Sequence, residues 1–133
     1  MNAFAQIACV AVGGGAGAVA RMLCVGAVAR GVGPALAPLG VVAVNILGSL
    51  AMGVVAFWVL RRAPEAQILV RTLIMTGFLG GFTTFSTFAL DLVGLIDEGR
   101  LGFAAGYLVS SVAGAILAFA LGWSVARSVL GAL

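Results

Sequence analysis

The sequence predicts an all-α integral membrane protein with four transmembrane helices, and three observations lead to this prediction. Of the 133 residues, 63% are hydrophobic and 8% are charged, and the mean hydropathy is +1.26. Soluble domains carry about 25% charged residues, so seven Arg and four acidic residues cannot cover a water-facing surface. The apolar residues form four continuous stretches, and one helical span takes roughly 20 residues. The length therefore accommodates four crossings in a single domain, residues 1–133.

We expect the spans at about residues 3–29, 40–60, 73–96 and 101–126. Clusters of charged or turn-forming residues separate them, at 31–34, 61–65 and 97–100, because Gly and Pro interrupt helices. The runs are continuous and do not alternate as the strands of a β-barrel would. The first positive residue is Arg21, so no charged leader precedes the first stretch. We expect that stretch to remain as a span, with both termini on one side.

The net charge of +3 comes from scattered arginines that form no basic groove, so we expect no nucleic-acid partner. Four arginines lie toward the side of the termini and two toward the other side: Arg61, Arg62, Arg71 and Arg127, against Arg30 and Arg100. This mild bias is compatible with cytoplasmic termini or with insertion in both orientations. The chain has no His, which excludes imidazole catalysis and His metal sites. Cys9 and Cys24 lie about 22 Å apart on one helix, so we expect packing roles.

Residues 13–18 read Gly-Gly-Gly-Ala-Gly-Ala, which superficially matches a dinucleotide-binding fingerprint. That fingerprint needs a preceding strand and a later acidic residue, and neither is present. Small residues also recur four positions apart: Gly13/Gly17, Ser49/Gly53, Gly77/Gly81 and Gly102/Gly106. In lipid such pairs allow the backbones of two helices to approach closely. We interpret these glycines as packing faces.

Two polar side chains fall inside predicted spans. Arg21 lies well before the end of the first span, and a buried arginine costs at least about 2.5 kcal/mol near mid-helix. It needs a counter-charge, helix-end carbonyls or a wet cavity, or it extends to the interface; it could also form a positive vestibule for an anion. Asn45, in the early half of the second span, supplies two N–H donors and one acceptor. It either bonds a neighbouring helix or faces a hydrated path.

Residues 77–88, Gly-Phe-Leu-Gly-Gly-Phe-Thr-Thr-Phe-Ser-Thr-Phe, place adjacent glycines and four hydroxyl groups in the third span. Adjacent glycines favour a helix break at Gly80–Gly81, since each costs about 1 kcal/mol inside a helix. Irregular backbone at this depth is tolerated only when it is buried in protein or lines a water-filled cavity. Broken helices of transporters use freed carbonyls to coordinate cations.

Aromatic and hydroxyl side chains indicate a polar track. Phe82, Phe85 and Phe88 recur every three residues and share a helix face; they either pack or present their positive ring edges to an anion. Hydroxyls beside this face come from two spans: Ser86 and Thr87, and in the last span Tyr107, Ser110 and Ser111, with Tyr107 and Ser111 one turn apart. With almost no carboxylate in the membrane, this set suits a small anion better than a cation.

At this point the sequence resembles the Fluc/CrcB family of fluoride channels over nearly the whole chain. The resemblance rests on four blocks in order: Gly13, Gly14, Gly17, Ala18 and Arg21; Val44, Asn45, Gly48 and Ser49; residues 77–88; and Tyr107 with Ser111. The third block is highly specific. The chain departs from the family pattern at three positions, with Ala89 and Asp91 in place of Ser and Glu, and Ala115 in place of a further serine.

The resemblance implies an antiparallel, dual-topology homodimer in the bacterial plasma membrane, with two fluoride pores along the subunit interface. It implies a central structural sodium ion, held by the backbone carbonyls of Gly80 and Thr83 of each chain. Phe85 and Phe88 would face the ions, and Arg21 would lie near a vestibule. The polar lining would be Asn45, Ser86, Thr87, Tyr107 and Ser111. The implied role is passive export of fluoride from the cytoplasm, without enzymatic activity.

Two other functions compete with this interpretation. A small four-helix, proton-coupled multidrug antiporter shares the size and the ambiguous orientation, but it needs a membrane-embedded carboxylate. Asp91 is the only candidate for that carboxylate. A non-transporting assembly subunit would also suit the composition, but it leaves the polar segment at residues 80–87 unexplained.

Overall fold

The computed structural model describes residues 1–62 and 67–130, and four of its helices are long and apolar enough to cross a membrane. The first is α1 (Ala3–Val32), and the second is α2 (Leu39–Arg62). The third comprises α3 (Gln67–Leu69), the π-helix η2 (Val70–Leu79), α4 (Gly80–Phe82) and α5 (Phe85–Asp97). The last is α6 (Leu101–Leu130). The four predicted apolar stretches thus correspond to the four long helical regions.

Local chemistry explains where the helices begin and end. Asn2 caps α1 by accepting a hydrogen bond from the Ala5 N–H at 2.9 Å. Gly33 ends the helix at φ +82°, a conformation that glycine adopts without strain, and the short 3₁₀ helix η1 (Pro34–Leu36) follows. Gly99, at φ +71°, makes the turn between α5 and α6. Residues 63–66, where the second span was expected to stop, lie outside the described residues.

The third region begins at Gln67, six residues before the predicted start of the span at residue 73. Arg71 suggested an interfacial boundary in the sequence. In the structure Arg71 is exposed on η2, and the helical backbone continues through it. A charged side chain at the rim leaves the backbone hydrogen bonds intact, so helices extend beyond their apolar segments. The same reason explains why α1 and α6 continue to Val32 and Leu130.

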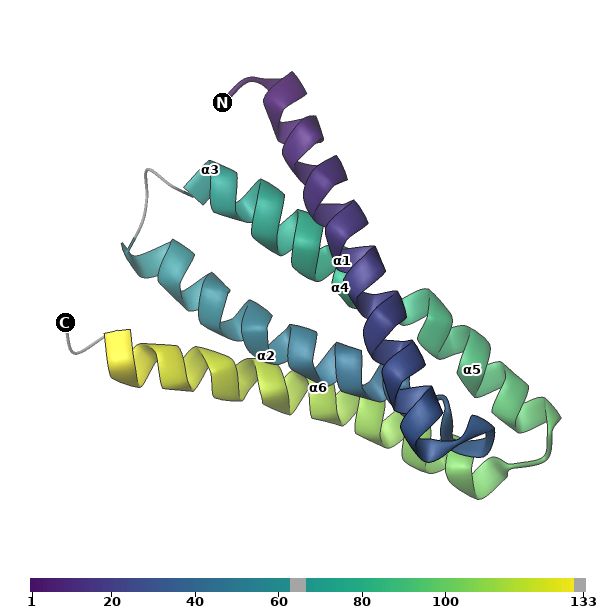
Figure 1. The fold of residues 1–133 in the computed structure, drawn as a ribbon. Helices are drawn as coiled ribbons and strands as arrows, with labels where there is room; N and C mark the ends of the chain where they lie inside the picture. Colours follow the sequence, from purple (N-terminus) through teal and green to yellow (C-terminus); the bar gives the residue numbers. More distant parts are fainter. Residues whose placement is uncertain (63–66, 131–133) are drawn as a thin grey trace.

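The helices form two closely packed pairs. Figure 1 shows α2 and α6 running side by side, whereas α1 lies along η2 and α4 and then crosses toward the turn between α5 and α6. Glycines permit both contacts: a Cβ at Gly53 would overlap the Phe119 carbonyl oxygen, and one at Gly17 would overlap that of Phe78. The predicted packing role is thereby confirmed for these glycines. Gly102 and Gly106, in contrast, face open space in this chain.

The start of α1, the end of α2 and the end of α6 lie at one end of the molecule, and η1 and the α5–α6 turn lie at the other (Figure 1). A compact apolar cluster near the second end includes Val41, Phe88 and Tyr107. Many large apolar side chains remain on the outside, such as Phe4 at 80% exposed and Leu90 at 72%. An apolar exterior of this kind suits lipid or a protein partner.

Candidate functional site

The backbone of the third helical region leaves the helical conformation at two consecutive threonines. Thr83 has φ −83° and ψ 156°, and Thr84 has φ −152° and ψ 122°, so both are extended between α4 and α5. Gly80 and Gly81, where we expected the helix to open, belong to α4. Instead of breaking the helix, Gly81 allows α1 to approach, because a Cβ there would overlap the Gly14 carbonyl oxygen.

In a continuous helix, two backbone N–H groups of this segment would bond backbone carbonyls. Here they bond side chains instead. The Thr84 N–H, four residues after Gly80, donates to Asn45 Oδ1 at 2.8 Å. The Thr87 N–H, four residues after Thr83, donates to Thr84 Oγ1 at 3.2 Å. The carbonyls of Gly80 and Thr83 therefore lack their usual i+4 donors. These are the two carbonyls for which the family resemblance implies a role in sodium binding.

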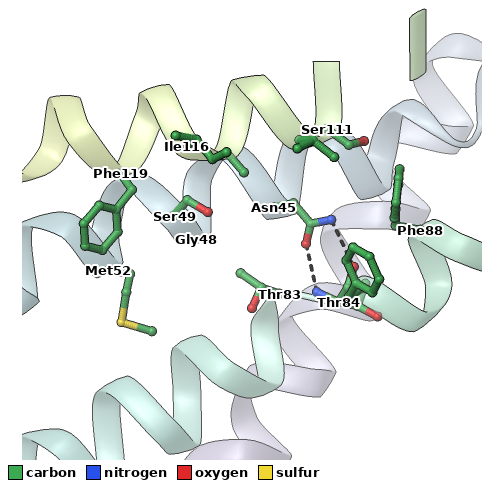
Figure 2. Close-up of a pocket in the computed structure, with 13 residues that line it drawn as sticks. Asn45, Gly48, Ser49, Met52, Thr83, Thr84, Phe88, Ser111, Ile116 and Phe119 are labelled. Carbon is green, nitrogen blue, oxygen red and sulfur yellow. Dashed lines mark hydrogen bonds between the residues drawn. The ribbon is translucent and has the colours of Figure 1, made fainter. Parts of the chain in front are cut away.

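Asn45 of α2 bonds both polar groups of the Thr84 backbone. Its Oδ1 accepts from the Thr84 N–H, and its Nδ2 donates to the Thr84 carbonyl at 3.0 Å. Figure 2 shows the two bonds as dashed lines from Asn45 to the extended segment. Of the two alternatives for Asn45, the structure thus shows the bond to a neighbouring helical region. Asn45 also lines the groove described next, and its amide has one N–H beyond the one that bonds the Thr84 carbonyl.

A groove of about 360 Å³ lies beside the extended threonines. Figure 2 shows it between the α2–α6 pair on one side and the third helical region on the other. Its polar lining is Asn45, Ser49, Thr83, Thr84 and Ser111, and its apolar lining includes Met52, Phe85, Phe88, Ile116 and Phe119. Ala115, where the family pattern has a further serine, also lines it. The groove thus combines hydroxyls, one amide and aromatic rings.

Ser111 is the most informative member of this lining. Ser111 is 4% exposed, and its Oγ has no hydrogen-bond partner within the described part of the chain. Leaving a buried hydroxyl unsatisfied costs about 1–3 kcal/mol. A bound ion or water in the groove would supply the missing partner.

Phe85 and Phe88 lie next to each other on the first turn of α5, with ring centroids 5.3 Å apart. Phe85 is 76% exposed and Phe88 only 4%, so one ring faces the open side of the groove while the other lies in the core. Phe88 also stacks on Tyr107 at 5.4 Å. The rings of Phe85 and Phe88 are thus neighbours that both line the groove.

The expected shared helix face of Phe82, Phe85 and Phe88 is wrong. It fails because the extended Thr83 and Thr84 separate Phe82 of α4 from α5. Phe82 stacks on Phe78 at 6.1 Å instead.

The other predicted lining residues lie around the same turn of α5. Ser86 is exposed, and Thr87 lines a second cavity of about 450 Å³ with Asp91 and Arg100. Tyr107 is buried, and its hydroxyl donates to Asp91 Oδ2 at 3.0 Å. The groove of Figure 2 thus takes Asn45, Phe85, Phe88 and Ser111, and the second cavity takes Thr87, whereas Ser86 and Tyr107 line neither of them. The first turn of α5 contributes to both cavities.

Arg21 reaches the extended segment from α1. Its Nη1 donates to the Thr83 carbonyl at 3.2 Å. Helix-end carbonyls were one of the environments that a buried arginine was expected to need, and Thr83 immediately follows α4. The predicted place of Arg21 at a vestibule remains a prediction.

Thr84 is a site residue that the sequence reasoning missed. It is 7% exposed and caps α5 with its hydroxyl. A signal was present, because Thr is a favoured N-cap residue and the segment from Phe85 onward has no further glycine for nine residues. In the sequence this hydroxyl is one of four in a polar segment. Ser49, expected only as a packing residue and as part of the family resemblance, lines the groove as well.

The fold and the groove define a small four-helix membrane protein whose buried polar groups gather at an interruption of the third helical region. The chain belongs to the CrcB-like family, since the family model described as CrcB-like protein, Camphor Resistance (CrcB), matches residues 8–123. This confirms the resemblance predicted from the sequence.

Curated relatives match most of the chain. A protein of Ruegeria sp. (strain TM1040) is 48% identical over 121 residues, which cover 91% of this chain and 94% of the relative. One of Chelativorans sp. (strain BNC1) is 44% identical over 121 residues, covering 91% and 95%. One of Francisella tularensis subsp. mediasiatica (strain FSC147) is 39% identical over 123 residues, covering 90% and 93%. All three are named fluoride-specific ion channel FluC. Ion channels are not enzymes, and none of these names supports the multidrug-antiporter alternative.

Proposed function

We propose that this protein is a fluoride-specific ion channel. The names of its relatives support the substrate, and the observation that carries the proposal on this chain is the unpartnered Ser111 hydroxyl in the groove. The O–H of Ser111 needs an acceptor, and fluoride is a small, strongly accepting anion. The groove provides that hydroxyl next to an amide and two aromatic rings.

The lining suits passage better than tight binding. Fluoride holds its water strongly, so a pore must replace that shell with donors at successive sites, each weak enough to release the ion. The remaining N–H of Asn45, the hydroxyls of Ser111 and Thr87, and the positive ring edges of Phe85 and Phe88 are such donors. Arg21 donates to the Thr83 carbonyl, so its positive charge lies beside the ion path and is not a site that binds the ion tightly.

We propose that the working unit is an antiparallel homodimer with two pores. Phe85 lines the groove and is 76% exposed in the single chain, so a second copy is needed to close the path around its ring. The distribution of arginines between the two ends of the chain is only mildly biased, which is compatible with insertion in both orientations. Passive export from the cytoplasm across the bacterial plasma membrane is the role that follows.

We further propose that a structural sodium ion binds at the centre of this dimer. The carbonyls of Gly80 and Thr83 fit the ion chemically, because both lack their i+4 N–H donors and carbonyl oxygen is a ligand for hard cations. Arg21 uses one lone pair of the Thr83 oxygen, and a carbonyl has two. When bound, sodium would supply the charge that these oxygens need and would link the two chains.

Fluoride efflux from liposomes that contain the purified protein tests the channel function. A fluoride electrode should record rapid release from the wild type, with chloride release far slower in parallel vesicles. If the wild type releases no fluoride, or releases chloride equally fast, the proposed function is wrong.

A matched pair of serine variants on α6 connects this test to the groove. Ser111→Ala removes a hydroxyl that has no partner in the chain, so we expect slower fluoride efflux without loss of stability. Ser128→Ala is the control, because Ser128 is exposed and donates to the Ser124 carbonyl at 3.0 Å. Equal flux in both variants would remove Ser111 from the path.

A further inference from the structure

Thr84 forms four hydrogen bonds with Asn45 and Thr87. Its backbone N–H and carbonyl both bond Asn45. Its hydroxyl oxygen accepts from the Thr87 N–H at 3.2 Å, and the hydroxyl donates to Thr87 Oγ1 at 3.0 Å. The residue is 7% exposed. Thr84 is therefore fixed in a single orientation at the start of α5.

The hydrogen bonds of Thr84 determine which of the neighbouring hydroxyls donates and which accepts. A threonine has one hydroxyl proton, and that of Thr84 is used on Thr87. By geometry alone either oxygen can donate in the 3.4 Å contact between Thr84 Oγ1 and Ser86 Oγ. With the Thr84 proton on Thr87, Ser86 is the donor. The three hydroxyls form a chain that runs from Ser86 through Thr84 to Thr87. The proton left over at the end of this chain is that of Thr87.

This chain of hydroxyls connects the two cavities. Thr84 lines the groove with Asn45 and Ser111, whereas Thr87 lines the second cavity with Asp91 and Arg100. The 3.0 Å bond between Thr84 and Thr87 is thus a polar link across the first turn of α5. In the second cavity the Asp91 carboxylate already accepts the Tyr107 hydroxyl, which offsets part of the negative charge that an anion would meet.

We propose that Thr84 is a positioning residue of the ion path. By giving its proton to Thr87, it leaves the Thr87 O–H free to donate to an anion that passes between the groove and the second cavity. Asn45 keeps Thr84 in place by bonding its backbone. This inference rests on the proposed fluoride-channel function and assigns to Thr84 a role through Thr87, distinct from any contact of its own with the ion.

Fluoride efflux from liposomes, measured with three substitutions at Thr84, tests the proposal. Thr84→Ser keeps the hydroxyl and should retain flux. Thr84→Val removes the hydroxyl at nearly equal volume and should lower flux about tenfold, the size of one lost hydrogen bond. Thr84→Asn keeps an N-cap acceptor but loses the hydroxyl, so it should be folded and slow. This variant guards against a folding failure of Thr84→Val. Thr72→Val is the control, because Thr72 bonds only the Ile68 and Leu69 carbonyls of its own helical region.

A double-substitution cycle separates positioning from helix capping. If Thr84 acts through the Thr87 hydroxyl, then Thr87→Val should be as slow as Thr84→Val, and the double variant no slower than either. If the two losses multiply, or if Thr84→Asn conducts like the wild type, the proposal is overturned. A wild type without fluoride flux would instead refute the channel function. A conducting wild type with a conducting Thr84→Val would refute only the role of Thr84.

Discussion

Arg21 Nη1 donates to the carbonyl oxygen of Thr83 at 3.2 Å, joining α1 to the extended segment across 62 positions of sequence. The bond is partly buried, and the Thr87 N–H that would otherwise serve this carbonyl bonds Thr84. The helix interruption is therefore supported from outside its own helical region. Without the guanidinium of Arg21, the Thr83 carbonyl oxygen needs another hydrogen-bond donor.

Replacing Arg21 with methionine should destabilise the folded protein. Arg21→Met keeps most of the apolar stem but removes the donor, and an unpaired buried acceptor costs about 1–3 kcal/mol. The midpoint of unfolding in detergent should fall accordingly. Arg30→Met, at an exposed position in the last turn of α1, is the control and should change stability by less. Equal midpoints for both variants would mean that the Thr83 contact is not stabilising.

Adding a methyl group at Gly17 should separate α1 from the third helical region. A Cβ at Gly17 would overlap the Phe78 carbonyl oxygen, and backbone cannot move aside cheaply, so we expect Gly17→Ala to cost about 1–3 kcal/mol or more. Gly15→Ala is the matched control, because a Cβ there has no neighbour within 4 Å. It should be neutral or slightly stabilising, since Ala favours helices. Thermal unfolding of both variants measures the difference.

Replacing Phe85 with isoleucine should slow fluoride flux without unfolding the protein. The ring is 76% exposed in the single chain, so little packing is lost, but the positive ring edge disappears. Phe4→Ile is the control at an 80% exposed position that does not line the groove. Liposome efflux should fall about tenfold or more for Phe85→Ile, as expected for the loss of a contact worth about 1.4 kcal/mol, and stay unchanged for Phe4→Ile. Normal efflux for Phe85→Ile would assign Phe85 to packing.

Replacing Phe88 tests the contact between a ring edge and the ion less directly than replacing Phe85. It is 4% exposed and stacks on Tyr107 at 5.4 Å. Phe88→Ile should therefore reduce stability as well as flux, because a change of shape in a packed core usually costs about 1 kcal/mol or more.

Changing Asn45 to aspartate should suppress flux. The carboxylate keeps an acceptor for the Thr84 N–H but loses the Nδ2 donor that bonds the Thr84 carbonyl at 3.0 Å. It also places a negative charge beside the groove, where it repels an anion. Efflux should become undetectable, while circular dichroism should still report helices. Fluoride passage at the wild-type rate would exclude Asn45 from both the path and its support.

Removing sodium should weaken the dimer and silence flux. An ion that binds only the assembled state stabilises that state by mass action. We expect loss of efflux and of the dimer by size-exclusion chromatography after exhaustive exchange of sodium for a bulky organic cation. Both should return when sodium is restored. If flux and dimerisation persist throughout the exchange, the proposed sodium at Gly80 and Thr83 should be abandoned.

The resemblance and the residues together predicted much of the site, but not its internal contacts. Asn45 and Ser111 carry polar groups inside apolar spans, and Phe85 and Phe88 carry positive ring edges that can face an anion. All four residues line the groove. Sequence patterns do not reveal that Asn45 bonds Thr84, because 39 positions separate the two residues. In the sequence Thr84 is one hydroxyl among four, and although Thr is a favoured N-cap residue, its bonds to Asn45 are visible only in three dimensions.

The sequence by itself determined the membrane class and the four helical regions of this protein. Continuous apolar runs set these regions, and hydrogen bonding within a helix depends only on local backbone. Tertiary structure decided where the third region is interrupted. Gly80 and Gly81 are the weaker helix formers, yet they are helical, because close packing of Gly81 against Gly14 favours a regular backbone there. The extended residues are Thr83 and Thr84, since Arg21 and Asn45, from two other helices, bond the backbone groups that the interruption exposes.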